Sequence, residues 1–164
     1  MQPPADTAST LAGIVRQEIP NPRAVGAWLA LLRAHATLMR ALDSDLRAKT
    51  GSGLNDFDVL GTLGDAGGSM RIADLAERAF SSRSGMTRRV DRLEGEGLVV
   101  RAQADEDGRG VVVGLTDAGA RRLARLARVH LRGVRRLFAE RLEEAEIAAL
   151  EAALQKVCAD TSFG

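Results

Sequence analysis

The sequence has a single cysteine, no tyrosine and one tryptophan, and aromatic residues make up only 3% of its 164 residues. One cysteine, Cys158, excludes an internal disulfide and a zinc site built from several thiolates. So few aromatic side chains argue against a stacking platform for single-stranded nucleic acid. The histidines, His35 and His130, lie far from each other and from the cysteine in the sequence, and show no metal-ligand spacing. We therefore expect no metal and no cofactor.

Long apolar runs are also absent. None approaches the roughly 18–20 residues that a membrane-spanning helix needs. The polar, proline-containing start of the chain lacks the apolar core of a signal peptide. No glycine-rich phosphate loop, nucleophile–base signature or pair of carboxylates marks a catalytic site. We expect a cytoplasmic protein that has no membrane partner and is not an enzyme.

Neither sign of charge is in excess, because 23 basic and 22 acidic residues give a formal net charge of +1. A role in nucleic-acid binding therefore depends on local clusters of charge. Of the basic residues, only Lys49 and Lys156 are lysines. Arginine binds phosphates and bases better than lysine does, although a GC-rich genome gives the same bias.

The spacing of apolar residues predicts helices over most of the chain. A polar tail over residues 1–9 and a short amphipathic stretch over 10–18 precede Pro20 and Pro22, which interrupt any continuous helix. A long helix is expected over 24–49. The other expected helices cover residues 55–64, 72–79, 82–94, 117–138 and 143–157. Two short β-rich runs, at 98–102 and 111–115, flank a polar turn and predict a β-hairpin.

A hairpin directly after a helix–turn–helix is typical of a winged helix. The predicted fold is mostly α with a small β-hairpin wing, in which N- and C-terminal dimerisation helices flank the winged helix–turn–helix core. The long outer helices carry apolar stripes, and a second copy of the chain is the simplest partner to cover them. The expected parts are a tail and short amphipathic segment (1–23), a dimerisation helix (24–53), a winged helix–turn–helix lobe (54–116) and C-terminal dimerisation helices (117–164).

The helix over 82–94 has the side chains of a DNA-reading helix. Met86, Val90 and Leu93 form an apolar stripe that packs it onto the preceding helix and leaves the opposite face outside. That outer face and its flanks carry hydroxyl, small and arginine residues: Ser82, Arg83, Ser84, Gly85, Thr87, Arg88, Arg89 and Arg92. A helix N-terminus donates N–H groups to phosphates, while Arg and Thr reach base edges in the major groove. A solvated charged helix is the alternative, and the hairpin that follows favours DNA binding.

The sequence IADLAE at 72–77 leads into this helix, and the hairpin carries DGR at 107–109 and ends in LTDAG at 115–119. Together these segments resemble the MarR family of bacterial transcriptional regulators, over about residues 24–157. The Asp-x-Arg followed by a β-run and Leu-Thr-x-x-Gly is their most specific element.

The resemblance implies a homodimer that binds double-stranded DNA at an inverted repeat, most often as a repressor that a ligand controls. Arg109 is expected in the minor groove, and Asp107 is expected to orient the wing tip. In the recognition helix the resemblance implies base contacts from Ser84, Thr87 and Arg88, and phosphate contacts from Arg83, Arg89 and Arg92. The alternative is an architectural or effector-independent DNA-binding protein. A third interpretation, an interaction module that no longer binds DNA, rests on Phe80 in a turn where glycine is usual.

Members of this family commonly bind a small, often aromatic or anionic effector between the dimerisation helices and the DNA-binding lobe. The candidate residues here are Trp28, His35, Phe57, Asp58 and His130. A purely structural role is the interpretation that we favour for each, with Trp28 packing the dimer and both histidines hydrogen-bonded in the core or interface.

The helix over 117–138 also carries a row of arginines opposite its apolar side. The row consists of Arg121, Arg125, Arg128, Arg132 and Arg135. Contact with DNA and pairing with the acidic last helix are both compatible with this row. A solvated face with ion pairs is the interpretation that we favour.

Overall fold

The computed structural model describes residues 7–79, 81–103 and 110–159. The chain divides into two compact units, residues 1–40 and 41–164. The first unit contains α1 (Thr7–Glu18) and the greater part of α2 (Pro22–Thr50). The side chain of Asn21 accepts a hydrogen bond from the Arg23 amide at 3.0 Å. Because proline needs no N–H partner in the first turn, Pro22 begins this helix, two residues before the predicted start.

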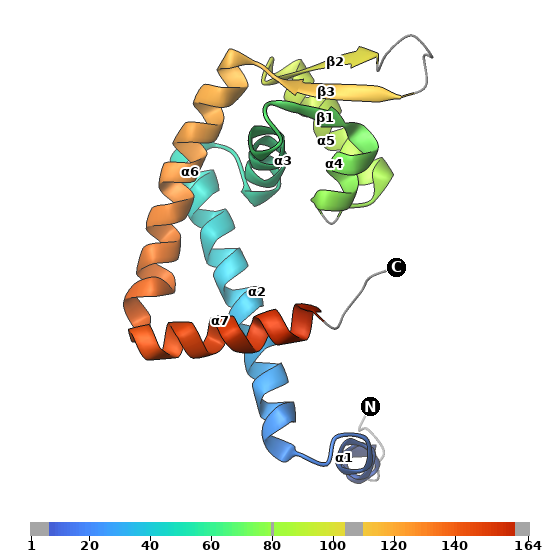
Figure 1. Cartoon of the computed structure of the whole chain (residues 1–164), viewed down its shortest axis with the longest axis vertical. Helices are drawn as coiled ribbons and strands as arrows, with labels where there is room; N and C mark the ends of the chain where they lie inside the picture. Colours follow the sequence, from blue (N-terminus) through green and yellow to red (C-terminus); the bar gives the residue numbers. More distant parts are fainter. Residues whose placement is uncertain (1–6, 80, 104–109, 160–164) are drawn as a thin grey trace, which may run out of the picture. The chain divides into compact units, whose positions relative to one another are not determined.

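The second unit is mostly helical and contains one small sheet (Figure 1). After the end of α2, its elements are α3 (Leu54–Asp65), β1 (Ser69–Arg71), α4 (Ile72–Arg78), α5 (Arg83–Gly95), β2 (Val99–Gln103), β3 (Val111–Leu115), α6 (Asp117–Leu137), the 3-10 turn η1 (Ala139–Arg141) and α7 (Glu144–Ala159). The helix–turn–helix of α4 and α5, followed directly by β2 and β3, confirms the predicted winged-helix fold class.

The sheet has three antiparallel strands in the order β1-β3-β2, one more than the predicted hairpin. In its register Val113 of β3 pairs with Met70 of β1 on one side and with Arg101 of β2 on the other. Strand β1 was missed because three residues are too few to show a period of two. It follows a turn in which Gly67 and Gly68 both have positive φ, of 81° and 103°.

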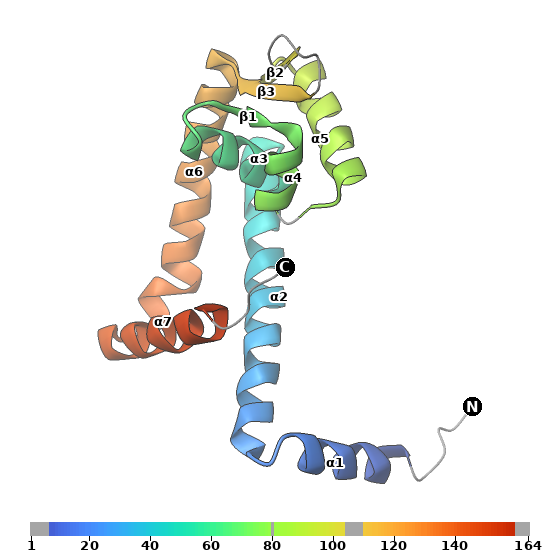
Figure 2. The same cartoon turned by 45° about the vertical axis from the view of Figure 1, so that its right-hand side comes forward.

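The core of the lobe lies between the helices and the sheet. Its fully buried large side chains are Leu46, Val59, Leu60, Leu63, Leu75, Met86, Val90, Leu93, Val99, Val113 and Leu126. Each such burial stabilises the fold by roughly 1.5–3 kcal/mol. Met86, Val90 and Leu93, the predicted stripe of α5, are all buried, so the opposite face of α5 is turned outward. In Figures 1 and 2, α3 lies between α6 and α5.

Thr116 joins the sheet to the start of α6. Its hydroxyl accepts a hydrogen bond from the Gly119 amide at 3.0 Å, which caps the helix, and donates to the Gly97 carbonyl at 2.8 Å. A Cβ on Gly119 would lie 2.0 Å from the Leu98 carbonyl oxygen, so only glycine permits this close approach. The Leu-Thr-x-x-Gly sequence is thus a structural joint between wing and helix.

We expect Thr116→Ala to lower the free energy of unfolding by about 1–2 kcal/mol, because it removes this N-cap. Urea denaturation of both proteins measures the loss. Thr116→Ser keeps the hydroxyl and serves as the matched control, which should stay close to the wild type. A Thr116→Ala protein as stable as the serine variant would contradict the capping role.

Candidate nucleic-acid interface

The N-terminus of α5 is capped by a side chain. The Ser82 hydroxyl accepts a hydrogen bond from the Gly85 amide at 3.1 Å. A Cβ on Gly85 would come within 2.9 Å of that hydroxyl, so glycine suits this turn of the helix. Thr87 donates from its hydroxyl to the Arg83 carbonyl at 3.0 Å. Ser82 and Gly85, predicted as DNA contacts, therefore also fix the N-terminal end of the helix.

Two arginines on this face have guanidinium groups that are not paired with other described residues. Arg83 and Arg88 are exposed, and neither forms a hydrogen bond or ion pair through its guanidinium with another described residue. Ser84 and Thr87 are exposed beside them, whereas Arg89 is half-buried. The first two turns of α5 thus combine free positive charge, hydroxyl groups and a positive helix end, an arrangement that suits phosphates and base edges.

Arg92, predicted to contact phosphates, has partners inside the lobe. Its guanidinium pairs with the buried carboxylate of Asp56 in α3 and donates to Glu96 at 2.8 Å. Asp56 is 36 residues away in the sequence, so no local pattern reveals this pair. A buried carboxylate is stable when it is paired. The structure thus gives Arg92 a role in holding α5 against α3.

Arg101 of β2, which the sequence analysis did not select, connects the wing to α5. Its guanidinium pairs with Asp91 at 2.6 Å and with Glu94, and also donates to the Thr87 carbonyl at 3.4 Å. The Arg101 amide donates to Glu94 at 3.1 Å. Asp91 lies on the outward face of α5 between Arg88 and Arg92. An acidic residue among these arginines was the only local sign that a basic partner lies nearby. These contacts hold strand β2 in one position along α5.

The predicted wing-tip residues, Asp107 and Arg109, lie outside the described residues, and so does Phe80. The described strands lead toward the tip as far as Gln103 on one side and resume at Val111 on the other. The roles of Asp107 and Arg109 stay predictions.

Three of the five predicted effector residues lie together in the second unit. The rings of Phe57 and His130 stack with centroids 4.5 Å apart and an angle of 27° between their planes. Burial lowers the pKa of His130, against the opposing charge of Asp58. Burial raises the pKa of the Asp58 carboxyl, and the positive charges of His130 and Arg89 oppose this shift.

The Nδ1 atom of His130 is buried and has no hydrogen-bond partner among the described residues. The interpretation of His130 as a satisfied, hydrogen-bonded core residue therefore does not hold at this atom. A hydroxyl or carboxylate group placed beside this atom could form the missing hydrogen bond. Trp28 and His35 belong to the other unit, where both are exposed.

The lowered pKa of His130 predicts a pH-dependent stability. Between the folded pKa and the ordinary histidine pKa of 6.5, the unfolded chain binds more protons than the folded one. Stability therefore falls as pH falls below that value, by at most about 1.4 kcal/mol per pH unit for one proton. Melting temperatures at about pH 7.5 and about pH 5.5 should show a smaller acid-induced loss for His130→Gln than for the wild type. His35→Gln is the matched control, and an acid loss in His130→Gln equal to the control's would rule out this role.

No helix among the described residues is long and apolar enough to cross a membrane. No group of three or more His, Cys, Asp or Glu side chains among them is placed to hold a metal ion.

Comparison with known proteins shows which family this interface resembles. The sequence profile of the MarR family matches residues 51–110. An uncharacterised HTH-type transcriptional regulator of Bacillus subtilis is 44% identical over 50 residues, a match that covers 30% of this chain and 31% of that protein. The chain thus matches less than a third of the length of this curated relative.

Solved structures extend the likeness over most of the chain. AbsC, a MarR family regulator from Streptomyces coelicolor, is 29% identical with a TM-score of 0.77, over 84% of this chain and 93% of AbsC. A second MarR family regulator from the same organism, solved in complex with DNA, is 28% identical with a TM-score of 0.78, over 87% and 91% of the two chains. The sequence profile and these structures agree with the winged helix of α4, α5, β2 and β3, and over this lobe the chain is similar to the MarR family of transcriptional regulators.

Proposed function

We propose that the chain is a sequence-specific DNA-binding regulator that recognises inverted-repeat promoter DNA as a homodimer and releases it when a small ligand binds. The observation that carries this proposal is the outward face of α5, where exposed Arg83 and Arg88 have no protein partner among the described residues. The similar Streptomyces regulator solved in complex with DNA supports it. The role is non-enzymatic, and blocking a promoter makes the protein a repressor.

In this proposal some side chains of α5 contact bases and others contact phosphates. Ser84, Thr87 and Arg88 contact base edges in the major groove, while Arg83 and Arg89 contact phosphates. Arg109 enters the minor groove with Asp107 beside it. Arg92 is left out of the DNA contacts, because its guanidinium pairs with two carboxylates of the lobe.

Exposed apolar side chains support a homodimer. In the first unit, α1 and the beginning of α2 expose Leu11, Ile14, Val15, Trp28, Leu29, Leu31 and Leu32. In α7 no described residue is buried, and Val157 is 61% exposed. Apolar surface of this extent is unfavourable in water, and a second copy of the chain is the partner that we propose. Analytical ultracentrifugation tests it, since a monomer at micromolar concentration would contradict the dimer.

The effector that we propose is a small aromatic or anionic molecule. A flat ring can extend the stack of Phe57 and His130, and a hydroxyl or carboxylate can bond to the unpartnered Nδ1 of His130. The Asp58 carboxyl lies beside them, and burial raises its pKa.

Selection from a pool of random DNA duplexes tests the proposed function directly. We expect the enriched sequences to contain two inverted half-sites with centres about 10 bp apart, because two recognition helices in a dimer enter successive major grooves on one side of the duplex. The DNA upstream of the protein's own gene is a second substrate for the same assay. A pool that shows no enriched sequence would contradict specific recognition.

A further inference from the structure

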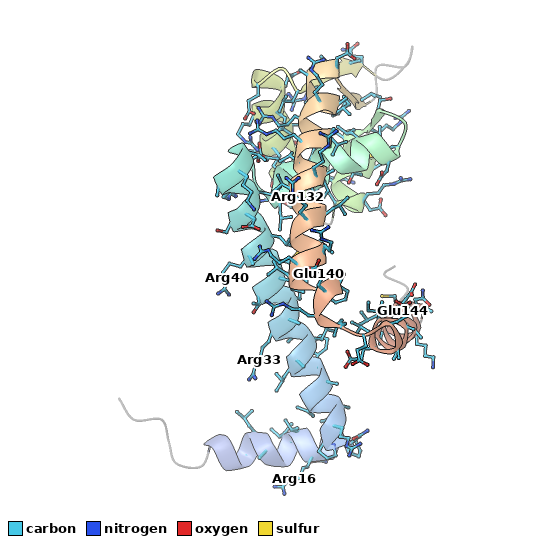
Figure 3. The ribbon with its side chains drawn as sticks, turned by 90° about the vertical axis from the view of Figure 1, so that its left-hand side faces the viewer. Arg16, Arg33, Arg40, Arg132, Glu140 and Glu144 are labelled. Atoms are coloured by element: carbon cyan, nitrogen blue, oxygen red, sulfur yellow. The ribbon has the colours of Figure 1, made fainter. Side chains whose placement is uncertain are left out.

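A groove between the end of α2 and residues 121–132 of α6 has no role in the proposed DNA contacts. Its volume is about 590 Å³, within the range of small-molecule sites. Its cationic lining residues are Lys49, Arg121, Arg125, Arg128 and Arg132, and the other two are aliphatic. Figure 3 views α6 from this side, with Arg132 labelled. No carboxylate lines the groove.

Most of the positive charge in the groove is not compensated. Arg121, Arg128 and Arg132 form no hydrogen bond or ion pair with any residue in the described part of the chain. Lys49 pairs with Asp45 at 3.4 Å, but the same carboxylate also binds Arg136 at 2.7 Å. Arg125 donates to the Lys49 carbonyl at 2.9 Å and so ties α6 to the end of α2.

Like charges one turn apart on a helix destabilise it by roughly 0.2–0.5 kcal/mol per pair. The row from Arg121 to Arg132 contains several such pairs. An anion bound between these arginines would offset their mutual repulsion. Arg135 binds Glu140 at 3.2 Å, as expected of a solvated face with ion pairs. Arg121, Arg128 and Arg132 are solvent-exposed and have no such pair within the described residues of this chain.

The groove is separate from the DNA-reading face. None of its lining residues belongs to α5 or to the strands, and α3 lies between α5 and α6 (Figures 1 and 2). DNA on the outward face of α5 therefore does not fill it. The twelve residues from Arg121 to Arg132 extend about 16 Å along the helix, enough for several phosphate groups in a row. The lining has no carboxylate that would repel phosphates and no aromatic side chain on which a base could stack.

We propose that this groove is a second ligand site, which binds the phosphate chain of a small polyphosphorylated anion. A linear polyphosphate and the phosphate chain of a nucleotide share this chemistry. Binding tightens the contact between α6 and the end of α2, since both helices contribute cations. The site is independent of the proposed operator contacts and of the effector residues proposed around His130.

Isothermal titration calorimetry and thermal melting of the full-length protein with sodium tripolyphosphate test the site. We expect tripolyphosphate to bind and to raise the melting temperature, since a ligand that binds only the folded state stabilises it. The Arg128→Gln/Arg132→Gln variant should bind roughly tenfold or more weakly, because two charge-assisted contacts are lost. Without ligand, this variant should melt no lower than the wild type, which separates loss of binding from loss of folding.

Arg78→Gln/Arg141→Gln is the matched control, since it removes the same charge from two exposed arginines outside the groove. It should bind tripolyphosphate like the wild type. Adenosine triphosphate, measured in parallel, identifies the source: equal affinity indicates a phosphate chain alone, and tighter binding indicates a nucleotide.

Absence of tripolyphosphate binding, or equal weakening in the control variant, would overturn the proposal. A groove variant that loses affinity for unrelated duplex DNA but not for tripolyphosphate would also overturn it, and would show that the groove is a DNA-backbone site. Affinity for the selected operator is measured separately and should be the same in the groove variant and its control, so failure here is distinguishable from failure of the proposed function.

Discussion

The Arg88→Ala variant is expected to bind its operator about 10- to 100-fold more weakly than the wild type and to discriminate less between operator and scrambled DNA. Arg88 is exposed on α5, and its guanidinium has no partner among the described residues. Alanine therefore removes no described contact of the folded protein, and the melting temperature should not change. Fluorescence anisotropy with operator and scrambled duplexes measures both affinities.

Arg83→Ala is the informative companion variant. A phosphate contact carries no sequence information, so its loss should weaken binding to operator and to scrambled DNA to a similar extent. It should also reduce the slope of log affinity against log salt concentration by about one. Arg141→Ala, in an exposed position far from α5 in the sequence, is the neutral control. If Arg88→Ala behaves like Arg141→Ala, the assignment of base contacts to the outward face of α5 is wrong.

Replacing Arg101 by methionine is expected to have the second large effect, because it separates the wing from the recognition helix. The substitution leaves Asp91 and Glu94 without their shared cation, and the Arg101 side chain is only 25% exposed. The free energy of unfolding should fall by about 1–3 kcal/mol. A drop of roughly 2–10 °C in melting temperature follows for a chain of this size.

Operator affinity of Arg101→Met should fall about tenfold, because β2 no longer fixes the wing against α5 and binding must then order it. Arg135→Met is the matched control: Arg135 also pairs with a carboxylate, but both side chains are more than half exposed. Exposed pairs contribute at most about 1 kcal/mol, so the control should change little. An Arg101→Met protein that is no less stable than this control would contradict the proposed link.

Local patterns predicted the parts of the site that depend on neighbouring residues. The stripe of Met86, Val90 and Leu93 fixed which face of α5 is outward, and Ser82 caps the helix as its hydroxyl suggests. Contacts between distant segments left no such trace. Arg92 with Asp56, and Arg101 with Asp91, become visible only when α3, α5 and β2 are packed together.

Two further differences have physical causes. Strand β1 forms because Met70 and its neighbours pair with β3. This is a tertiary contact, and three residues are too few to show the alternating pattern of a strand. The grouping of Phe57, Asp58 and His130 was expected from the family resemblance, whereas the unpartnered Nδ1 of His130 depends on the surrounding packing. The uncompensated arginines of α6 likewise depend on the groove that α2 and α6 form together.

The most direct test of the central claim compares binding to the selected inverted repeat with binding to a scrambled duplex at about 50 mM and about 200 mM salt. Fluorescence anisotropy of the full-length protein gives the four affinities. A specific regulator should prefer the inverted repeat by roughly a thousandfold or more at the higher salt, since base contacts survive when phosphate contacts weaken. Affinities for the two duplexes that are similar and fall together as salt rises would contradict the account, and would favour an architectural DNA-binding protein.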